Sequence, residues 1–583
     1  APADIWVPLE QAMPPGSPMW TRGRWLQLLA RLGPGVTHAQ AEAEATALTG
    51  RKITLQQGGT GFSRLRERFS RPVIVLECVV ALVLLIACAN LANLTLAGAA
   101  SRHSEFALRK AIGAGRGRLV RQLLTENLLV SALGAMLALA VAGWMSAAML
   151  RFLPPEAAPA LANLRFHLNG PVLAFTASVS LATCLLLGLA PAIRATSHSL
   201  AAGMKREGNW ANRGLIVAEV AMCTLLLIGA ALFVESLRNL RALPTGYSDV
   251  EHIVTADVEM PRTYSAADRR QRMEDLRQRA AALPGVQVAA TSHIRPLSGF
   301  SISDGIPING EIQNIDVQHV SPGFLAAMGT PLITGRDFSE RDDTRAPQVA
   351  IVNESFVRQF LADGNPLGAH FGLEIVGVVR DTRWINLKDK PPAMYYRPLA
   401  QWDGTAMTLV VRATGDFATV SAGLGRAAHD VDPKIALRDV VPFREMEDRI
   451  LVIERMLAQG ATAFGALALL VACIGLYGVL AYGVARRTRE IGVRMALGAS
   501  RGGVQWMVLR ESLALLAVGF AIGVPAALAL TRYSAAMLFG ITAHDPRAMV
   551  SALGILLAVA LAAAAIPARR AASVDPLTAL RYE

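Results

Sequence analysis

Residues 102–129 read RHSEFALRKAIGAGRGRLVRQLLTENLL, and residues 487–514 repeat the same pattern as RTREIGVRMALGASRGGVQWMVLRESLA. Both copies are basic, and each lies between two long apolar runs. A short basic segment repeated between apolar runs indicates a duplicated membrane unit, whose two copies face the same side of the bilayer.

The apolar runs predict an α-helical, polytopic membrane protein. The chain has 583 residues, of which 53% are hydrophobic and 17% charged, with a mean hydropathy of +0.37. Crossing the ~30 Å hydrocarbon core takes about 20 apolar residues. We expect seven spans, at Pro72–Leu96, Asn127–Leu150, Pro171–Ile193, Gly214–Leu237, Gly460–Val484, Ser512–Thr531 and Met549–Ile566.

The net charge of +12 lies in the loops between these runs. The segments 101–121 and 485–510 each hold six Lys or Arg residues, whereas the opposite loops, 154–170 and 533–546, hold only Arg165. By the positive-inside rule the basic loops are cytoplasmic. The positive charge therefore marks topology, and we predict no nucleic-acid partner.

The sequence carries no motif typical of covalent chemistry. It contains no GxxxxGK[ST] loop for nucleotide phosphates, and neither HExxH nor CxxC. All five cysteines lie in the predicted spans, so no disulfide framework is expected. The acidic turn after Gly335-Arg336-Asp337-Phe338 lacks the ligand spacing of a calcium site. We expect no catalytic, cofactor-binding or metal-binding residues in this chain.

A large segment outside the membrane separates the fourth and fifth spans. Within residues 238–456, strand-like runs such as VQVAATS, QVAIVN and LEIVGVV alternate with predicted helices at Ser265–Ala282 and Asp416–Val431. This alternation predicts a mixed α/β domain of two lobes. A further amphipathic helix is predicted at Thr37–Thr49.

Several motifs in order resemble the MacB/FtsX-like permeases of ATP-binding-cassette (ABC) systems. They include LLIACANLANLTLAGAASRHSEFALRKAIGAGR at 84–116, PGVQVAATSHIRPLSG at 284–299, VSPGFLAAMGTPLITGRDFSERDD at 320–343 and IPARRAASVDPLTALRYE at 566–583. The resemblance covers nearly the whole chain. It is closest to the duplicated permeases that carry two such units and no ATPase domain.

This resemblance gives the predicted domain organisation. Since the second half has one span, a domain and three spans, we expect eight spans in the intact protein. The predicted parts are a remnant of a first periplasmic domain (1–71), three spans of the first FtsX-like unit (72–193), a cytoplasmic link (194–213), a span (214–237), a second, MacB-like periplasmic domain (238–456), three spans of the second FtsX-like unit (457–567) and a cytoplasmic tail (568–583).

The repeated segments contain the candidate functional residues. In each, Glu precedes Arg by four residues, which places both on one helical face, and Gly follows where a short helix would end. The resemblance implies that these are coupling helices that dock on an ATPase. The candidate docking residues are Glu105, Arg109, Gly113 and Ala114 in the first copy, and Glu490, Arg494, Gly498 and Ala499 in the second.

Two amides interrupt the first apolar run. Asn90 and Asn93 lie three residues apart on one face. Because an amide in hydrocarbon is costly without a hydrogen bond, we expect both to make helix–helix contacts rather than substrate contacts.

The resemblance implies a permease subunit in the bacterial inner membrane whose partners are a cytosolic ABC ATPase dimer, the lipid bilayer and a periplasmic adaptor or substrate. ATP would be bound only by the partner subunit. Two other readings stay open. One is an FtsX-like scaffold that regulates a periplasmic partner such as a cell-wall hydrolase. The other is a membrane-bound enzyme, which the missing catalytic motifs disfavour.

Overall fold

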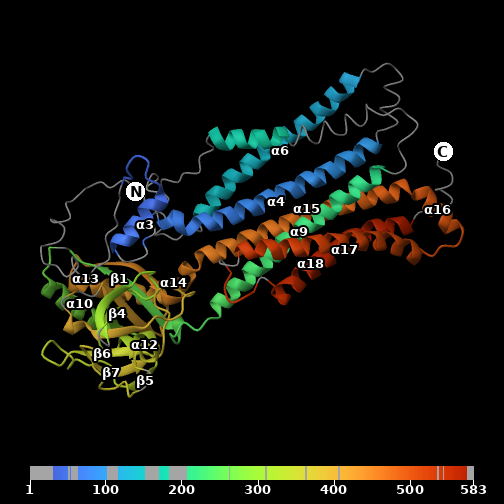
Figure 1. Ribbon diagram of the computed structural model, residues 1–583. Coiled ribbons are helices and arrows are strands. Elements are labelled where there is room, and N and C mark those ends of the chain that lie inside the picture. Colours follow the sequence, from blue (N-terminus) through green and yellow to red (C-terminus); the bar gives the residue numbers. More distant parts are fainter. Residues whose placement is uncertain are drawn as a thin grey trace. The chain divides into compact units, whose positions relative to one another are not determined.

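A computed structural model describes residues 31–49, 53, 55, 64–101, 116–151, 170–182, 207–261, 263–308, 311–361, 364–402, 404, 407–534, 538–542 and 544–573. The chain divides into two compact units. The first, Ala1–Phe69 and Ala242–Val452, contains the α/β domain, and the second, Ser70–Arg241 and Ile453–Glu583, is the helical unit (Figure 1).

Among its described residues, the helical unit contains five helices long and apolar enough to cross a membrane, with mean hydropathies of 2.3 to 2.8 over their most apolar windows. Two shorter apolar helices, Leu128–Trp144 and Gly170–Ala182, lie within the second and third predicted spans. The prediction of a polytopic helical membrane protein is therefore confirmed. The helices are α4 (Arg64–Ser101), α6 (Arg116–Arg151), α9 (Glu207–Arg241), α15 (Val452–Arg486), α16 (Thr488–Ala496), α17 (Arg501–Ser534) and α18 (Pro546–Ala572).

Small residues allow the long helices to pack closely. On α17, a Cβ added to Gly519 would lie 2.4 Å from Cγ1 of Val220, and one added to Gly523 would lie 2.8 Å from the carbonyl oxygen of Ala221, both on α9. Lipid chains are as apolar as leucine, so helix association in a bilayer depends on such close packing. Figure 1 shows α9, α17 and α18 running alongside one another.

The α/β domain is built around one ten-stranded sheet. The strand order is β10-β1-β9-β2-β4-β8-β6-β7-β5, and β3 pairs with β4. The strands are β1 (Ile253–Glu259), β2 (Val286–Ser292), β3 (Ile302–Ile308), β4 (Glu311–Val320), β5 (Leu332–Gly335), β6 (Val349–Asn353), β7 (Glu374–Val379), β8 (Met394–Pro398), β9 (Thr408–Ala413) and β10 (Ala436–Pro442).

Short helices connect and cover these strands. They are α3 (His38–Thr49), η2 (Val250–His252), α10 (Ala266–Ala281), α11 (Phe324–Met328), α12 (Glu354–Phe360), η3 (Leu399–Gln401), α13 (Phe417–Val431) and α14 (Phe443–Ile450). The predicted helices at Ser265–Ala282 and Asp416–Val431 are confirmed. Both Ser265 and Asp416 cap their helix by accepting a backbone N–H bond.

Two hydrophobic cores support the two predicted lobes. In the first, Leu276 of α10 and Leu424 of α13 pack on β1, β2 and β9, and in the second, Phe356 of α12 packs on β6, β7 and β8. Burying one such side chain contributes roughly 1.5–3 kcal/mol. The lobes join where β2 meets β4, through the single register pair Ser292 and Val320.

Candidate functional site

The second repeat forms a short amphipathic helix, α16. Glu490 and Arg494 are about half exposed and form an ion pair of 2.7 Å between Oε1 and Nη2, in the i, i+4 arrangement. Such exposed pairs contribute only about 0.3–0.5 kcal/mol to stability. The Glu490–Arg494 pair therefore matters mainly because it holds a fixed pattern of charge on the surface of α16.

Gly498 and Ala499 end α16 with a Schellman cap. The N–H of Ala499 donates to the carbonyl of Arg494 at 3.0 Å, and the N–H of Gly498 donates to that of Met495 at 3.1 Å. Gly498 has a φ of +95°, which a side chain would strain. The glycine of the repeat thus fixes where the helix stops.

Apolar side chains flank the charges of α16 and remain uncovered. Leu497 is 83% exposed and Trp506, on the first turns of α17, is 59% exposed. Trp and Arg are enriched where proteins bind one another. The exposed residues Glu490, Arg494 and Leu497 of α16, and Trp506 at the start of α17, are of the types found at protein-binding sites.

Glu511 of α17 ties the start of α16 to span α9. It accepts hydrogen bonds from Arg213 on α9 and, at 3.2 Å, from Arg487, which immediately precedes α16. All three side chains are 32–42% exposed. This Glu511 bridge links the coupling segment to the span that enters the α/β domain.

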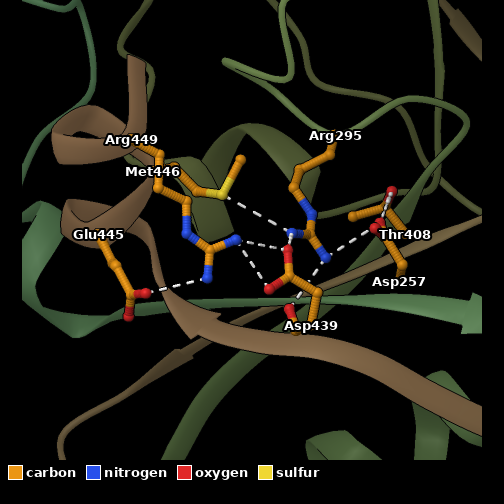
Figure 2. Close-up of polar contacts among 7 residues, drawn as sticks. All are labelled: Asp257, Arg295, Thr408, Asp439, Glu445, Met446 and Arg449. Carbon is orange, nitrogen blue, oxygen red and sulfur yellow. Dashed lines mark hydrogen bonds and ion pairs between the residues drawn. The ribbon is translucent and has the colours of Figure 1, made fainter. Parts of the chain in front are cut away.

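A second polar cluster lies within the α/β domain, where α14 leaves the sheet (Figure 2). Arg295, whose side chain is only 4% exposed, pairs with Asp257 of β1 at 3.0 Å and with Asp439 of β10. Asp439 also accepts two bonds from Nη1 of Arg449 on α14, at 2.8 and 2.9 Å. We call Asp257, Arg295, Asp439 and Arg449 the Arg295 cluster.

Burial shifts the pKa values of two members of the Arg295 cluster. It raises the pKa of Asp257, an effect that the Arg295 guanidinium partly opposes, and it lowers the pKa of Arg449. Glu445 accepts a 2.9 Å bond from Arg449 one turn away on α14. Each buried charge therefore has an opposite charge beside it, as burial requires.

The segment entering the domain is bound to the helix leaving it. The rings of Tyr247 and Phe443 meet edge to face at 5.2 Å, and Arg444 pairs with Glu251. Leu451, 2% exposed, is the only residue between α14 and span α15. The two chain connections to the spans therefore contact each other within the α/β domain.

Comparison with known families agrees with this architecture. The model of the FtsX-like permease C-terminal domain matches residues 78–200 and again 462–576, and that of the MacB-like periplasmic core domain matches residues 214–427. The chain is an FtsX-like permease with a MacB-like periplasmic core domain. Its FtsX domain occurs twice, as the repeat predicts.

Relatives of the permease include the uncharacterized ABC transporter permease YknZ of Bacillus subtilis, 28% identical over 46% of this chain and 70% of that one. The pyoverdine export ATP-binding/permease protein PvdT of Pseudomonas aeruginosa is 26% identical over 47% of this chain and 45% of its own. The macrolide export ATP-binding/permease protein MacB of Bdellovibrio bacteriovorus is 22% identical over 46% and 44%. The matched region covers less than half the length of PvdT and of this MacB.

Two solved structures also match the permease weakly. The periplasmic region of MacB from Actinobacillus actinomycetemcomitans is 17% identical, with a TM-score of 0.26, and covers 37% of this chain and 97% of its own. The extracellular domain of the transporter YknZ from Gram-positive bacteria is 14% identical, with a TM-score of 0.23, and covers 32% and 100%. Scores this low support no structural argument.

The first coupling segment of the permease, with Glu105, Arg109, Gly113 and Ala114, lies outside the described residues. The amides of α4 are described. Asn90, 6% exposed, donates from Nδ2 to the carbonyl of Val471 on α15 at 2.9 Å. Asn93 is fully buried, and its amide has no hydrogen-bond partner among the described residues.

The GRDF segment of the permease is a turn. Arg336 donates two bonds of 2.8 Å to Asp342, whose Oδ2 also accepts from the N–H of Ser339. The Arg336 hydrogen bonds are the main reason that the pKa of Asp342 is lowered. The carboxylate of Asp342, which the sequence indicated to be solvated, is instead buried and committed to contacts within the turn.

Sequence reasoning missed the Arg295 cluster. Arg295 falls in the quoted motif PGVQVAATSHIRPLSG, but its partner Asp439 is 144 residues away. The one available signal was an arginine between Ile294 and Pro296 at the end of a buried strand. A charge in that position requires a buried partner.

Proposed function

We propose that the permease passes movement from a separate cytosolic ATPase dimer to its periplasmic α/β domain. The observation that carries this proposal is the continuity of α15. This single helix of 35 residues, about 50 Å long at ~1.5 Å per residue, is separated from α16 only by Arg487 and from α14 only by Leu451.

On this proposal α16 is the docking element. Its ion pair Glu490–Arg494 and the exposed Leu497 and Trp506 offer charge and apolar area together. Through the Glu511 bridge, a displacement of α16 would be passed to α9 as well as to α15. ATP would be bound by the ATPase alone, and the first repeat would dock a second ATPase subunit through Glu105 and Arg109.

At the other end, the Arg295 cluster receives the movement. A shift of α14 acts on Asp439 through Arg449 and on β1 through Arg295 and Asp257. Asp439 lies on β10 and Asp257 on β1, the two strands at one edge of the sheet. Buried, mutually paired charges hold a defined geometry, so they transmit displacement instead of absorbing it.

We further propose that the movement serves export across the bacterial cell envelope. This is supported by relatives named for export of pyoverdine and of macrolides. An FtsX-like scaffold would instead hold a periplasmic protein through the α/β domain. Affinity capture with the detergent-solubilised chain separates the two, because a scaffold retains one periplasmic protein stoichiometrically whereas an exporter retains the ATPase.

The docking step is tested by photo-crosslinking in cells. A crosslinking amino acid at Leu497 is expected to capture an ATP-binding protein. The same residue at Arg345, whose side chain is 90% exposed on the α/β domain, should not. Reversing the charge by Glu490→Lys together with Glu105→Lys should reduce the capture at least tenfold. Undiminished capture in that variant would contradict the proposal.

A further inference from the structure

Residues from three helices meet in the interior of the helical unit. Asn90 of α4 is 6% exposed and Glu219 of α9 is 2% exposed. Both reach Gly475 of α15. A Cβ added to Gly475 would lie 2.6 Å from Oδ1 of Asn90 and 3.0 Å from Oε2 of Glu219. The two oxygens therefore lie close together in the notch left by the glycine.

The orientation of the Asn90 amide is fixed by Val471. The carbonyl oxygen of Val471 can only accept, so the amide nitrogen of Asn90 must be the atom that faces it, at 2.9 Å. The amide oxygen then faces Glu219. The amide oxygen of Asn90 has no hydrogen-bond partner in the described part of the chain. Oε1 of Glu219 has none there either.

This arrangement leaves two acceptor oxygens lining the same buried notch at Gly475, away from water. A carboxylate and an amide oxygen repel one another unless a hydrogen or a cation lies between them. No ion pair with Glu219 is found among the described residues. The ionisable groups that face it are the thiols of Cys223 on its own helix and Cys473 on α15, which supply no positive charge.

We propose that Asn90, Glu219 and Gly475 form a proton-binding site within the transmembrane bundle. Glu219 is held as the neutral acid, and its hydroxyl donates to Oδ1 of Asn90. The step is a simple protonation, in which the carboxylate oxygen takes one proton from a hydronium ion. One O–H bond forms on Glu219, one O–H bond of the hydronium breaks, and a water molecule is left. No group of three or more His, Cys, Asp or Glu side chains that could hold a metal ion is found among the described residues.

Proton binding would hold together the helices that connect to the α/β domain. The protonated acid joins α9 to α4, and the Asn90 amide joins α4 to α15. Glu219 lies six residues from Arg213, about 9 Å along α9 at ~1.5 Å per residue, so a small opening at that end brings it to water. Loss of the proton would then favour separation of these helices, since a bare carboxylate is costly in the bundle. This inference does not depend on ATPase coupling.

The test is infrared difference spectroscopy of the full chain in lipid nanodiscs. At neutral pH the wild-type chain is expected to show the carbonyl band of a protonated carboxylic acid, which shifts in heavy water. Glu219→Gln, an isostere of the neutral acid, should fold normally and lose this band. Asn90→Ala should keep the band but shift it, because the hydrogen bond that tunes it is lost.

A matched control lies on the same helix. Glu235 is paired with Arg238 at 3.2 Å, so Glu235→Gln should leave the band unchanged. A folded wild-type chain without the band, or a band that survives Glu219→Gln, would overturn the proposal. Stabilisation of the wild-type chain, but not of Glu219→Gln, by added Na⁺ or K⁺ would also overturn it, because the site would then bind a cation.

Discussion

Asp439 accepts two hydrogen bonds from Nη1 of Arg449, at 2.8 and 2.9 Å, while the guanidinium of Arg295 pairs with the same carboxylate. One carboxylate thus contacts two cations whose side chains are 13% and 4% exposed. Asp439 also has a φ of 51°, a left-handed conformation that Asp and Asn adopt more readily than other residues with side chains.

We expect Asp439→Asn to destabilise the α/β domain by about 3 kcal/mol, because it keeps the backbone conformation but removes the carboxylate charge that two buried cations share. Hydrogen exchange of β1 and β10 amides in the full chain measures this. Asp343→Asn is the control, since its partner Arg345 is 90% exposed, and it should cost less than about 1 kcal/mol. Equal effects of the two variants would show that the Arg295 cluster adds no stability.

The α/β domain should lose stability in mild acid. Burial lowers the pKa of His319 to about 3 and that of His293 to about 4, and Trp402 stacks on His319 at 4.2 Å. Since these folded-state values lie below the unfolded value of about 6.5, stability is fully present above pH 6.5 and falls as the pH drops toward 4. By linkage the loss for His319 is on the order of 2 kcal/mol at pH 5.

His319→Phe should remove part of this pH dependence, because the ring is kept without a titrating nitrogen. The exposed His429 of α13 is the control, and His429→Gln should leave the profile unchanged. The measurement is thermal unfolding of the full chain between pH 7.5 and 4.5, followed by hydrogen exchange of β4. An acid profile identical in wild type and His319→Phe would contradict the assignment.

Much of the fold follows from the sequence because its signals are local. Long apolar runs predict spans, and strands such as β6 and β9, buried along their whole length, read as apolar runs. The strand β4 was missed because its sequence, EIQNIDVQHV, is rich in polar residues and does not read as an apolar run. Gln318 and His319 are buried there, and Gln318 donates to the carbonyl of Ile294 at 2.5 Å.

The candidate sites also divide into one that local sequence signals predict and two that they do not. The short helix α16, the proposed docking element, can be predicted from Glu490, Arg494 and Gly498, which lie within about two turns of one another. The Arg295 cluster and the Asn90–Glu219 contact join residues more than a hundred positions apart. Their members are single polar residues in apolar surroundings, a pattern that shows that a partner is needed without showing which residue supplies it.

The close approach of α17 to α9 can be tested at one glycine. Gly523→Ala would place a Cβ 2.8 Å from the carbonyl oxygen of Ala221. Because this oxygen belongs to the backbone of α9, it cannot easily move away. We expect a loss of about 1–3 kcal/mol, seen as a lower unfolding temperature in detergent. Gly554→Ala on α18 is the control, because its added Cβ meets no atom within 4 Å. A similar shift for both glycines would mean that the α9–α17 packing is looser than described.

The cap of α16 provides the most direct test of the docking element. Gly498→Ala puts a side chain at a φ of +95°, at a cost of roughly 1–2 kcal/mol, so the end of α16 should fray and reposition Leu497. Photo-crosslinking from Leu497 to the ATPase should then fall several-fold, while thermal stability of the full chain changes little. Gly502→Ala, on the first turn of α17 with open space around its Cβ, should crosslink as well as wild type. If both variants crosslink like wild type, the ATPase reads a surface other than the capped end of α16.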